Sequence, residues 1–240
     1  MKQKWLIIPA HPDDEAKASG LVLKERQKDD EITILVMRLC GEGSPCDRPA
    51  WTRKEAIAQR SAEMAEAARY WNARLLWWQP PHPANENIKY TETNLVRMLE
   101  LLEELDPTHI VTHWSEDQHP DHCGTAEIVT GAVTRMAWRH DVLLYYFDQP
   151  NPLKFQPHFQ ANCHIDLSDP AMLAACLWTR FVHRSQTASI IMENYLKLYK
   201  EHGREIGTEY AMAYMVCRIA AKVTKTAPGN NLRLSEEAVR

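Results

Sequence analysis

Two short segments carry most of the side chains in this chain that can bind a metal or move a proton. The first is His-Pro-Asp-Asp-Glu at residues 11–15, and the second is Glu-Asp-Gln-His-Pro-Asp-His at residues 116–122. His11 and Asp14 are three residues apart, so both can face one metal, and His122 can complete a set of three ligands. Two histidines and one carboxylate with an open fourth position are typical of a catalytic zinc site, although the same set also binds Fe(II).

Other polar residues in the same segments can carry out the chemistry beside such a metal. Asp13 adjoins a ligand and can take a proton from the attacking water. His119 lies three residues before His122 and can stabilise or protonate a tetrahedral intermediate, while Asp121 can orient His119 and favour its protonated form. A metal lowers the pKa of water to about 7, and together with an imidazolium it stabilises an oxyanion. The combination is suited to amide or ester hydrolysis.

Each segment also has a purely structural interpretation. Asp and Glu are common in the first turn of a helix, so Asp13, Asp14 and Glu15 alone are as consistent with helix capping as with catalysis. A His-x-x-His spacing arises often by chance in helices. Both segments, however, directly follow an expected parallel strand, and this joint placement favours a functional site.

The elements that must position these residues follow from the pattern of apolar residues. Strands are expected at residues 5–10, 32–37, 75–78, 109–112, 142–147 and 163–167, and helices at residues 15–28, 52–71, 91–105, 123–138, 170–182, 190–202 and 209–221. This alternation predicts an α/β fold with a Rossmann-like, mostly parallel β-sheet flanked by helices. Ligands of such sheets bind outside the carboxyl ends of the strands, which is where both segments begin.

Length and composition narrow the class of protein. The chain has 240 residues and 27.7 kDa, and we expect a single domain over residues 1–223 followed by a polar tail over residues 224–240. A net charge of −4 argues against a broad nucleic-acid-binding surface. No apolar run is long enough to cross a membrane, no signal peptide is evident, and the six cysteines form no C-x-x-C pair. We therefore expect reduced thiols, a cytoplasmic location and no membrane partner.

The two segments together resemble a known family. Pro-Ala-His-Pro-Asp-Asp-Glu at residues 9–15 and His-Pro-Asp-His at residues 119–122 are similar to the LmbE or PIG-L family of zinc-dependent N-acetylglucosamine deacetylases. This family includes the deacetylases of mycothiol and bacillithiol synthesis. Further matches are Gly-Glu-Gly at residues 41–43, Arg-x-x-Glu at residues 60–63 and His-Arg-Ser-Gln at residues 183–186. The resemblance thus covers residues 4–187, most of the chain.

The resemblance implies a role for each residue that matches the family pattern. It makes His11, Asp14 and His122 the zinc ligands, one metal ion per chain, and it makes Asp13 the general base. It assigns His119 to the oxyanion or to the general acid.

Three further residues complete the predicted site. The resemblance implies that Asp121 orients His119 and that Arg60 holds sugar or phosphate oxygens, a task that suits a guanidinium group. Trp114 follows the fourth strand and is expected to reach the pocket, where an indole ring can stack on a sugar. Glu15 is expected to have a structural role only.

The sequence therefore predicts a zinc-dependent hydrolase that removes the N-acetyl group of an N-acetylglucosamine-type substrate and releases acetate and a free amino sugar. Two alternatives stay open: a zinc amidase or esterase for another acylated small molecule, and a non-catalytic sugar- or metal-binding member of the fold. Asp117 stands where the mycothiol branch has a tyrosine, which leaves the substrate open. The resemblance and the tryptophan content favour a homo-oligomer of unspecified order.

Overall fold

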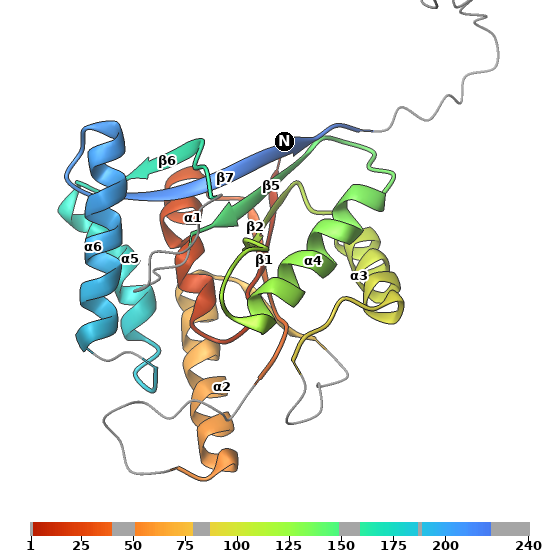
Figure 1. Cartoon of the computed structure of the whole chain (residues 1–240), viewed down its shortest axis with the longest axis horizontal. Helices are drawn as coiled ribbons and strands as arrows, with labels where there is room; N and C mark the ends of the chain where they lie inside the picture. Colours follow the sequence, from red (N-terminus) through yellow and green to blue (C-terminus); the bar gives the residue numbers. More distant parts are fainter. Residues whose placement is uncertain (1, 40–50, 79–86, 149–158, 187–188, 222–240) are drawn as a thin grey trace, which may run out of the picture.

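A seven-stranded β-sheet with helices on both faces forms the framework of the protein (Figure 1). The computed structural model describes residues 2–39, 51–78, 87–148, 159–186 and 189–221. The strands are β1 (Lys4–Ile8), β2 (Glu31–Val36), β3 (Arg74–Trp77), β4 (His109–His113), β5 (Val142–Phe147), β6 (Cys163–Asp166) and β7 (Ala211–Ile219). The helices are the 3-10 helix η1 (Asp14–Ala18) and the α-helices α1 (Ser19–Glu25), α2 (Arg53–Tyr70), α3 (Glu92–Leu105), α4 (Pro120–Arg135), α5 (Pro170–Phe181) and α6 (Ser189–Ile206).

The order of the strands places a topological switch point at the carboxyl ends of β1 and β4. The order is β3-β2-β1-β4-β5-β7-β6; the first five strands are parallel neighbours, and β7 runs antiparallel to both β5 and β6. This arrangement confirms the predicted mostly parallel α/β fold. From β1 the chain continues to β2 on one side, whereas β4 lies on the other side, so the connections after β1 and β4 diverge. Ligands of open α/β sheets bind at such a point of divergence.

The central strand β1 is apolar from Trp5 to Ile8 because both of its faces are buried. In β1, Trp5 and Ile7 pack on one face with residues of α1, α2, α5 and α6, whereas Leu6 and Ile8 pack on the other with residues of α3 and α4. Figure 1 shows this division, with α3 and α4 together on one side of the sheet. Because side chains of a strand alternate between faces, a strand covered on both sides reads as a continuous apolar run.

Two helices that follow the candidate catalytic segments, residues 11–15 and 116–122, differ from the prediction at their starts. The helix expected over residues 15–28 is the 3-10 helix η1 followed by the short helix α1. Helix α4 begins at Pro120 and not at residue 123, because proline suits the first position of a helix and the His119 side chain caps it. His122 therefore lies in the first turn of α4.

The helix predicted over residues 209–221 is wrong, since this segment contains strand β7. Alanine and methionine favour helix locally, which explains the prediction. In the folded chain β7 instead forms hydrogen bonds with β5 along one edge and with β6 along the other. Tyr214, fully buried in β7, donates its hydroxyl to the carbonyl oxygen of Lys17 (2.9 Å) and accepts from the N–H of Leu21 (3.2 Å). These distant partners override the local preference.

Several expectations fall outside the described residues. Among them are Gly-Glu-Gly at residues 41–43, the domain boundary at residue 223 and the tail from residue 224. In the part of the chain that the structure describes, no helix combines the length and apolarity that crossing a membrane requires.

Replacing Tyr214 with Phe is expected to lower the free energy of unfolding by about 1–3 kcal/mol, because the Leu21 N–H and the Lys17 carbonyl lose their buried partner. Urea denaturation followed by circular dichroism measures this change. Tyr90→Phe is the control, since Tyr90 is 40% exposed, and it should change stability by less than about 0.5 kcal/mol. Equal stability of both variants would contradict the assigned role of the Tyr214 hydroxyl.

Candidate metal centre

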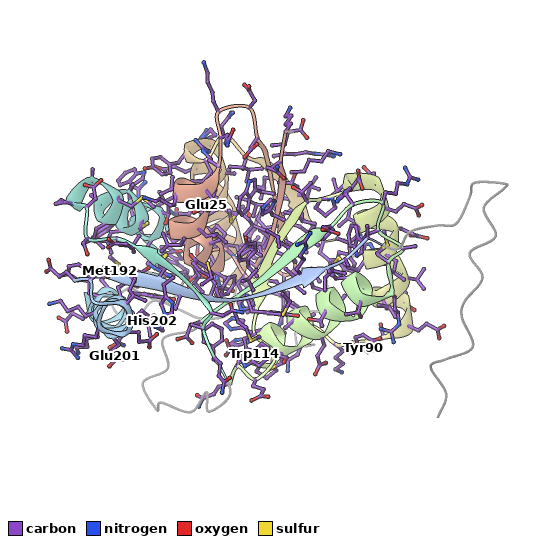
Figure 2. All side chains as sticks on the ribbon, turned by 90° about the horizontal axis from the view of Figure 1, so that it is seen from above. Glu25, Tyr90, Trp114, Met192, Glu201 and His202 are labelled. Atoms are coloured by element: carbon purple, nitrogen blue, oxygen red, sulfur yellow. The ribbon has the colours of Figure 1, made fainter. Side chains whose placement is uncertain are left out.

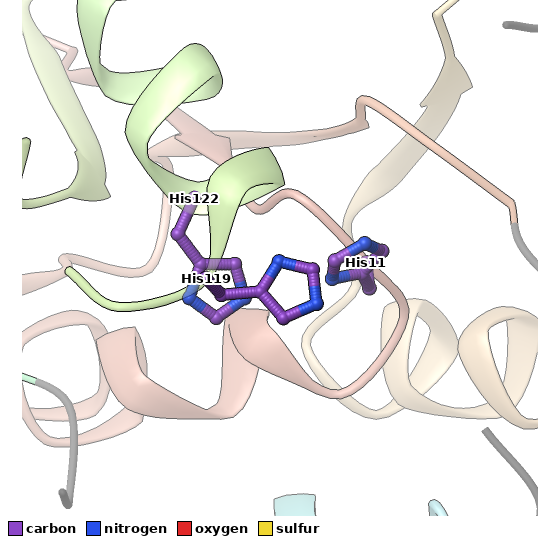
Figure 3. Close-up of side chains that lie close together, drawn as sticks. All are labelled: His11, His119 and His122. Carbon is purple, nitrogen blue, oxygen red and sulfur yellow. The ribbon is translucent and has the colours of Figure 1, made fainter. Parts of the chain in front are cut away.

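The two segments singled out in the sequence meet at the carboxyl ends of β1 and β4. His11 lies in the connection from β1 to η1, and Asp14 is the first residue of η1. His122 lies in the first turn of α4, which follows β4. All three side chains are buried. Figure 3 shows the rings of His11, His119 and His122 gathered in this region. The predicted ligands therefore lie together at the switch point of the sheet.

The Asp14 carboxylate lies close enough to each of the two imidazoles to share a metal ion with it. Asp14 Oδ2 lies 3.4 Å from His11 Nδ1 and 3.3 Å from His122 Nε2. Zinc bonds to nitrogen and oxygen of about 2.0–2.1 Å at tetrahedral angles separate neighbouring ligand atoms by about 3.3 Å. In donor type, and in the distance of each imidazole from Asp14, these residues match a divalent metal bound by two imidazoles and one carboxylate. The groups of three near this site whose donor atoms all lie within 4.8 Å of one another are His11, His119 and His122, and Asp14, His113 and His122.

A second carboxylate contacts each of these two imidazoles on the nitrogen that faces away from Asp14. His11 Nε2 lies 2.8 Å from Asp121 Oδ2, and His122 Nδ1 lies 2.7 Å from Asp117 Oδ2. Such outer carboxylates set the tautomer and the orientation of metal-binding histidines and increase their basicity. The lone pairs of His11 Nδ1 and His122 Nε2 are thereby directed toward Asp14.

The partners of Asp121 differ from those expected. The sequence predicts that its carboxylate orients His119. In the structure the carboxylate contacts His11 and accepts from Arg38 Nη1 (2.7 Å) and from the N–H of Ile88 (2.7 Å). Only its backbone reaches His119, donating its N–H to Nδ1 at 3.2 Å. Burial opposes the charge, yet the hydrogen bonds with His11 and Ile88 hold the pKa of Asp121 well below its usual value. The Asp121 carboxylate therefore contacts the predicted ligand His11 and not the His119 ring.

Lysine and histidine neighbours keep Asp14 ionised. Lys17 Nζ donates to Asp14 Oδ1 at 2.6 Å, which leaves Oδ2 facing the imidazoles. Burial disfavours the charge, but Lys17 and His122 hold the pKa of Asp14 well below its usual value. In turn, although burial opposes the imidazolium, the carboxylates of Asp14 and Asp117 raise the pKa of His122 to about 9. The metal-free site thus keeps a proton on His122 at neutral pH.

His113, at the end of β4, approaches the same carboxylate but is less suited to be a ligand. Its Nε2 lies 3.4 Å from Asp14 Oδ2 and accepts the backbone N–H of Ala10 at 2.9 Å, so its lone pair is already engaged. Its ring stacks on that of His122, with centroids 4.0 Å apart. Burial and the neighbouring His122 hold the pKa of His113 well below its usual value, so it packs against the ligands as a neutral ring.

His119 is placed to donate one hydrogen bond into the site as a neutral group. Its exposed ring stacks on His122 at 4.6 Å and lies 4.9 Å from His11. Because Nδ1 accepts from the backbone of Asp121, the ring proton belongs on Nε2. Burial and the charges of His122 and His11 lower the pKa of His119 to about 4. They outweigh the Asp121 carboxylate, which favours the imidazolium as expected from the sequence.

Asp13 adopts a backbone conformation that is rare for a residue with a side chain. Its φ is +102°, and its N–H donates to Glu15 Oε2 at 2.9 Å. The side chain is 36% exposed, and Oδ1 lies 3.6 Å from Arg60 Nη2. Loss of hydration and the neighbouring Asp14 carboxylate raise the pKa of Asp13. The structure thus brings the predicted base next to the predicted ligand set.

The two predicted substrate-binding residues lie in different surroundings. Arg60, buried in α2, donates from Nη2 to the carbonyl oxygen of Pro12 at 3.0 Å, so it contacts the loop that carries Asp13. Trp114, labelled in Figure 2, packs edge-to-face against Tyr146 and Phe159 on the side of the sheet covered by α3 and α4. Arg60 thus lies beside the candidate base Asp13, whereas Trp114 packs partly into the core.

Sequence reasoning missed three residues of the site. Lys17 is three residues after Asp14, Arg38 follows the end of β2, and Asp117 lies in the second segment itself. The position of Arg38 just beyond the carboxyl end of a parallel strand was a usable signal. Asp117 could have been found by requiring an outer carboxylate for each ligand histidine.

Comparisons with known proteins agree with this placement. The family model described as "PIG-L: GlcNAc-PI de-N-acetylase" matches residues 6–133, more than half of the chain. The chain belongs to the PIG-L family. The matched span contains both segments of the candidate metal centre, so the resemblance predicted from the sequence is confirmed.

Relatives of this PIG-L protein include a curated sequence and several solved structures. A protein of Bacillus subtilis (strain 168) described as "Probable N-acetyl-alpha-D-glucosaminyl L-malate deacetylase 2" is 28% identical over 141 residues, which are 56% of this chain and 62% of the relative, less than two thirds of its length. The N,N'-diacetylchitobiose deacetylase of Pyrococcus horikoshii is 18% identical with a TM-score of 0.74, over 90% of this chain and 84% of that one. The 4-carboxy-2-hydroxymuconate hydratase GalB of Pseudomonas putida KT2440 is 14% identical with a TM-score of 0.69, over 94% of this chain and 99% of that one. The two structures share the fold.

Replacing Asp117 with Asn is expected to weaken zinc binding by about 10–100-fold, because His122 loses the carboxylate that orients it and raises its basicity. Competition with a chromophoric chelator measures the affinity. Asp106→Asn is the matched control, since Asp106 forms a similar pair with His140 (3.0 Å) outside the candidate metal centre. Unchanged affinity in Asp117→Asn would remove Asp117 from the site.

The pKa of His122 predicts how zinc affinity depends on pH. Metal binding requires the neutral imidazole, and in the metal-free chain its pKa is about 9, so zinc must displace a proton at any lower pH. The affinity should therefore rise by about tenfold per pH unit from pH 7 toward 9 and level off above it. Chelator-buffered titrations at several pH values, with proton release recorded, test this. A flat profile between pH 7 and 8.5 would contradict it.

Proposed function

We propose that the chain is a zinc-dependent hydrolase that removes the N-acetyl group of an N-acetylglucosamine-type small molecule, releasing acetate and a free amino sugar. The observation that carries the proposal is the set of three donor atoms from His11, Asp14 and His122, with Asp13 and His119 beside it. Membership of the PIG-L family supports an acetamide as the bond that is cleaved. The deacetylase names of the B. subtilis relative and the P. horikoshii structure support it further.

The metal in this proposal is held by His11 Nδ1, Asp14 Oδ2 and His122 Nε2. When bound, zinc supplies Lewis acidity, which lowers the pKa of water to about 7 and polarises a carbonyl oxygen. Two imidazoles and one carboxylate are donor types that catalytic zinc sites use.

The flanking residues carry the proton transfers. Asp13 takes a proton from the water that attacks the acetamide carbonyl, and its raised pKa brings it nearer to the working pH, as a general base requires. His119 donates from Nε2 to the oxygen of the tetrahedral intermediate, where hydrogen bonds are worth most. The proton held by Asp13 then passes to the amine nitrogen as the C–N bond breaks, and the oxygen of water remains in acetate.

Substrate contacts stay predictions from the sequence. Arg60 lies beside Asp13, which suits a contact with sugar or phosphate oxygens near the cleaved bond. Trp114 stays the candidate for stacking on the sugar. A cytoplasmic location and a homo-oligomer are likewise retained as proposals. The exposed aromatic residues Trp178 and Phe181 of α5, with Tyr70 against Trp178, offer apolar surface for such a contact.

A second candidate function is suggested by the likeness to the hydratase GalB, which has the same fold. A site that activates water can add it to a carbon–carbon double bond as well as to an acyl group. Cleavage of another amide or of an ester is a nearer alternative. Deacetylation releases acetate, whereas hydration of a double bond does not. An assay for acetate therefore distinguishes deacetylation from hydration.

Asp13→Asn is expected to keep about one zinc per chain and to lower the rate of acetate release by about 100–10,000-fold, because the amide cannot take the proton. Elemental analysis and an acetate assay with a panel of N-acetylglucosamine conjugates measure both quantities. Asp29→Asn, at an exposed position outside the site, is the control and should match the wild type.

The outcomes separate the alternatives. An active Asp13→Asn variant would remove Asp13 from the role of base. Zinc in the wild type without acetate from any conjugate would point to another acyl group, an ester or a double bond. A wild-type chain that takes up no metal would overturn the proposal of a metal-dependent hydrolase.

A further inference from the structure

A buried acid–base pair lies directly behind the candidate base. Glu15 is fully buried, and one of its oxygens, Oε1, forms a short hydrogen bond with His183 Nε2. The other oxygen, Oε2, accepts the backbone N–H of Asp13 at 2.9 Å. His183 is 1% exposed and follows α5, 168 residues away along the chain. Both oxygens of Glu15 are thus engaged, one by the loop and one by a distant element.

The peptide group between Pro12 and Asp13 is held at both of its polar atoms. Its carbonyl oxygen, on Pro12, accepts from Arg60 Nη2 at 3.0 Å, and its N–H, on Asp13, donates to Glu15. These two contacts come from opposite sides of one planar unit. Because the plane of a peptide cannot twist, fixing both atoms fixes the direction from which the chain enters the Cα of Asp13.

The φ of Asp13 shows why such a double hold is needed. At +102°, it is sterically disfavoured for a residue with a Cβ, and conformations of this kind persist only where the surroundings impose them. If the Asp13 N–H lost its acceptor, the peptide could rotate toward the ordinary region. The side chain would then turn away from Asp14 and the water that it is proposed to deprotonate.

Two motifs outside the candidate metal centre supply the supports. Arg60 and Glu63 lie one turn apart on α2, and Glu63 accepts from both the N–H (2.9 Å) and the hydroxyl of Ser185. Ser185 is two residues after His183. The Arg-x-x-Glu and His-Arg-Ser-Gln motifs therefore join in space and clamp the loop that carries Asp13.

We propose that Glu15, supported by His183, is a positioning residue for the reaction: it holds the Pro12–Asp13 peptide so that the Asp13 carboxylate faces the attacking water. This inference rests on the proposed function, because it gives Glu15 a role through Asp13. It also goes beyond the expectation from the sequence that Glu15 has a structural role only.

Glu15→Ala removes the acceptor of the Asp13 N–H and is expected to lower kcat for acetate release by about 10–100-fold, the effect of a small displacement of a catalytic group. KM and zinc content should stay unchanged, since the ligands and the substrate contacts remain. Glu15→Gln keeps an oxygen for the N–H and an amide group for His183, so it should retain most of kcat. Loss of zinc in Glu15→Ala would contradict the proposal and give Glu15 a role in the metal site.

A double-mutant cycle distinguishes positioning from a general structural role. In the Asp13→Asn background no base remains to be positioned, so Glu15→Ala should cause no further loss of kcat. Losses that multiply in the double variant would overturn the proposal.

A variant at His183 provides the same test if Glu15→Ala does not fold. His183→Phe keeps the volume but removes the partner of Glu15, and kcat should again fall while KM holds; His183→Gln, which can still donate, should restore it. His140→Phe is the matched control, because His140 forms a pair with Asp106 at the amino ends of β4 and β5, away from the candidate metal centre. Equal kcat in His183→Phe and His140→Phe would contradict the proposal.

A structural readout keeps the inference separate from the proposed function. If the wild type releases no acetate, the proposed function fails, whatever Glu15 does. A crystal structure of Glu15→Ala still reports the φ of Asp13: we expect it to leave the left-handed region, and an unchanged value near +102° would overturn the inference by itself.

Discussion

The carboxylate of Asp14 is the group on which the rest of the site depends. A buried charge is costly unless it is paired, and Asp14 is paired on both oxygens: Lys17 takes Oδ1, and imidazole nitrogens surround Oδ2. In the metal-free chain His122 carries the balancing proton, as its pKa of about 9 shows. A divalent cation at the same place replaces that proton. The electrostatic balance of the fold is thus already arranged for a positive charge between Asp14 and His122.

The sheet brings these groups together because of one feature of its topology. The connections after β1 and β4 diverge, and each ends in a helix. The first turn of each of these helices carries a residue of the candidate metal centre. The support continues behind the site, where Tyr214 of β7 joins η1 and α1 through its hydroxyl. Helix α2 and the segment after α5 hold the loop of Asp13. Elements from both ends of the chain therefore converge on a few residues.

Local pattern in the sequence predicted the parallel sheet, because continuous apolar runs of nearby residues mark buried strands. It also predicted that the two segments meet, because each directly follows a strand and ligands bind at the carboxyl ends of parallel strands. It did not predict β7, since the partners that make Ala211–Ile219 a strand lie in β5 and β6, far away in sequence. It also paired Asp121 with its neighbour His119. The structure pairs Asp121 with His11 and Arg38, and Arg38 is 83 residues distant. Side-chain partners of this kind become visible only when the turns of α4 are placed against β2.

The distribution of negative charge decides what each histidine can do. Asp121 and Asp117 are used on His11 and His122, where a carboxylate strengthens a metal ligand. His119 receives only a backbone N–H and stays neutral, with a pKa of about 4. An imidazolium at this place would be repelled by a metal ion bound between His11 and His122, whereas a neutral ring with its proton on Nε2 can lie close to the metal and still donate to a developing oxyanion. The two carboxylates thus act on His11 and His122, whereas burial and the charges of those two histidines keep the His119 ring neutral.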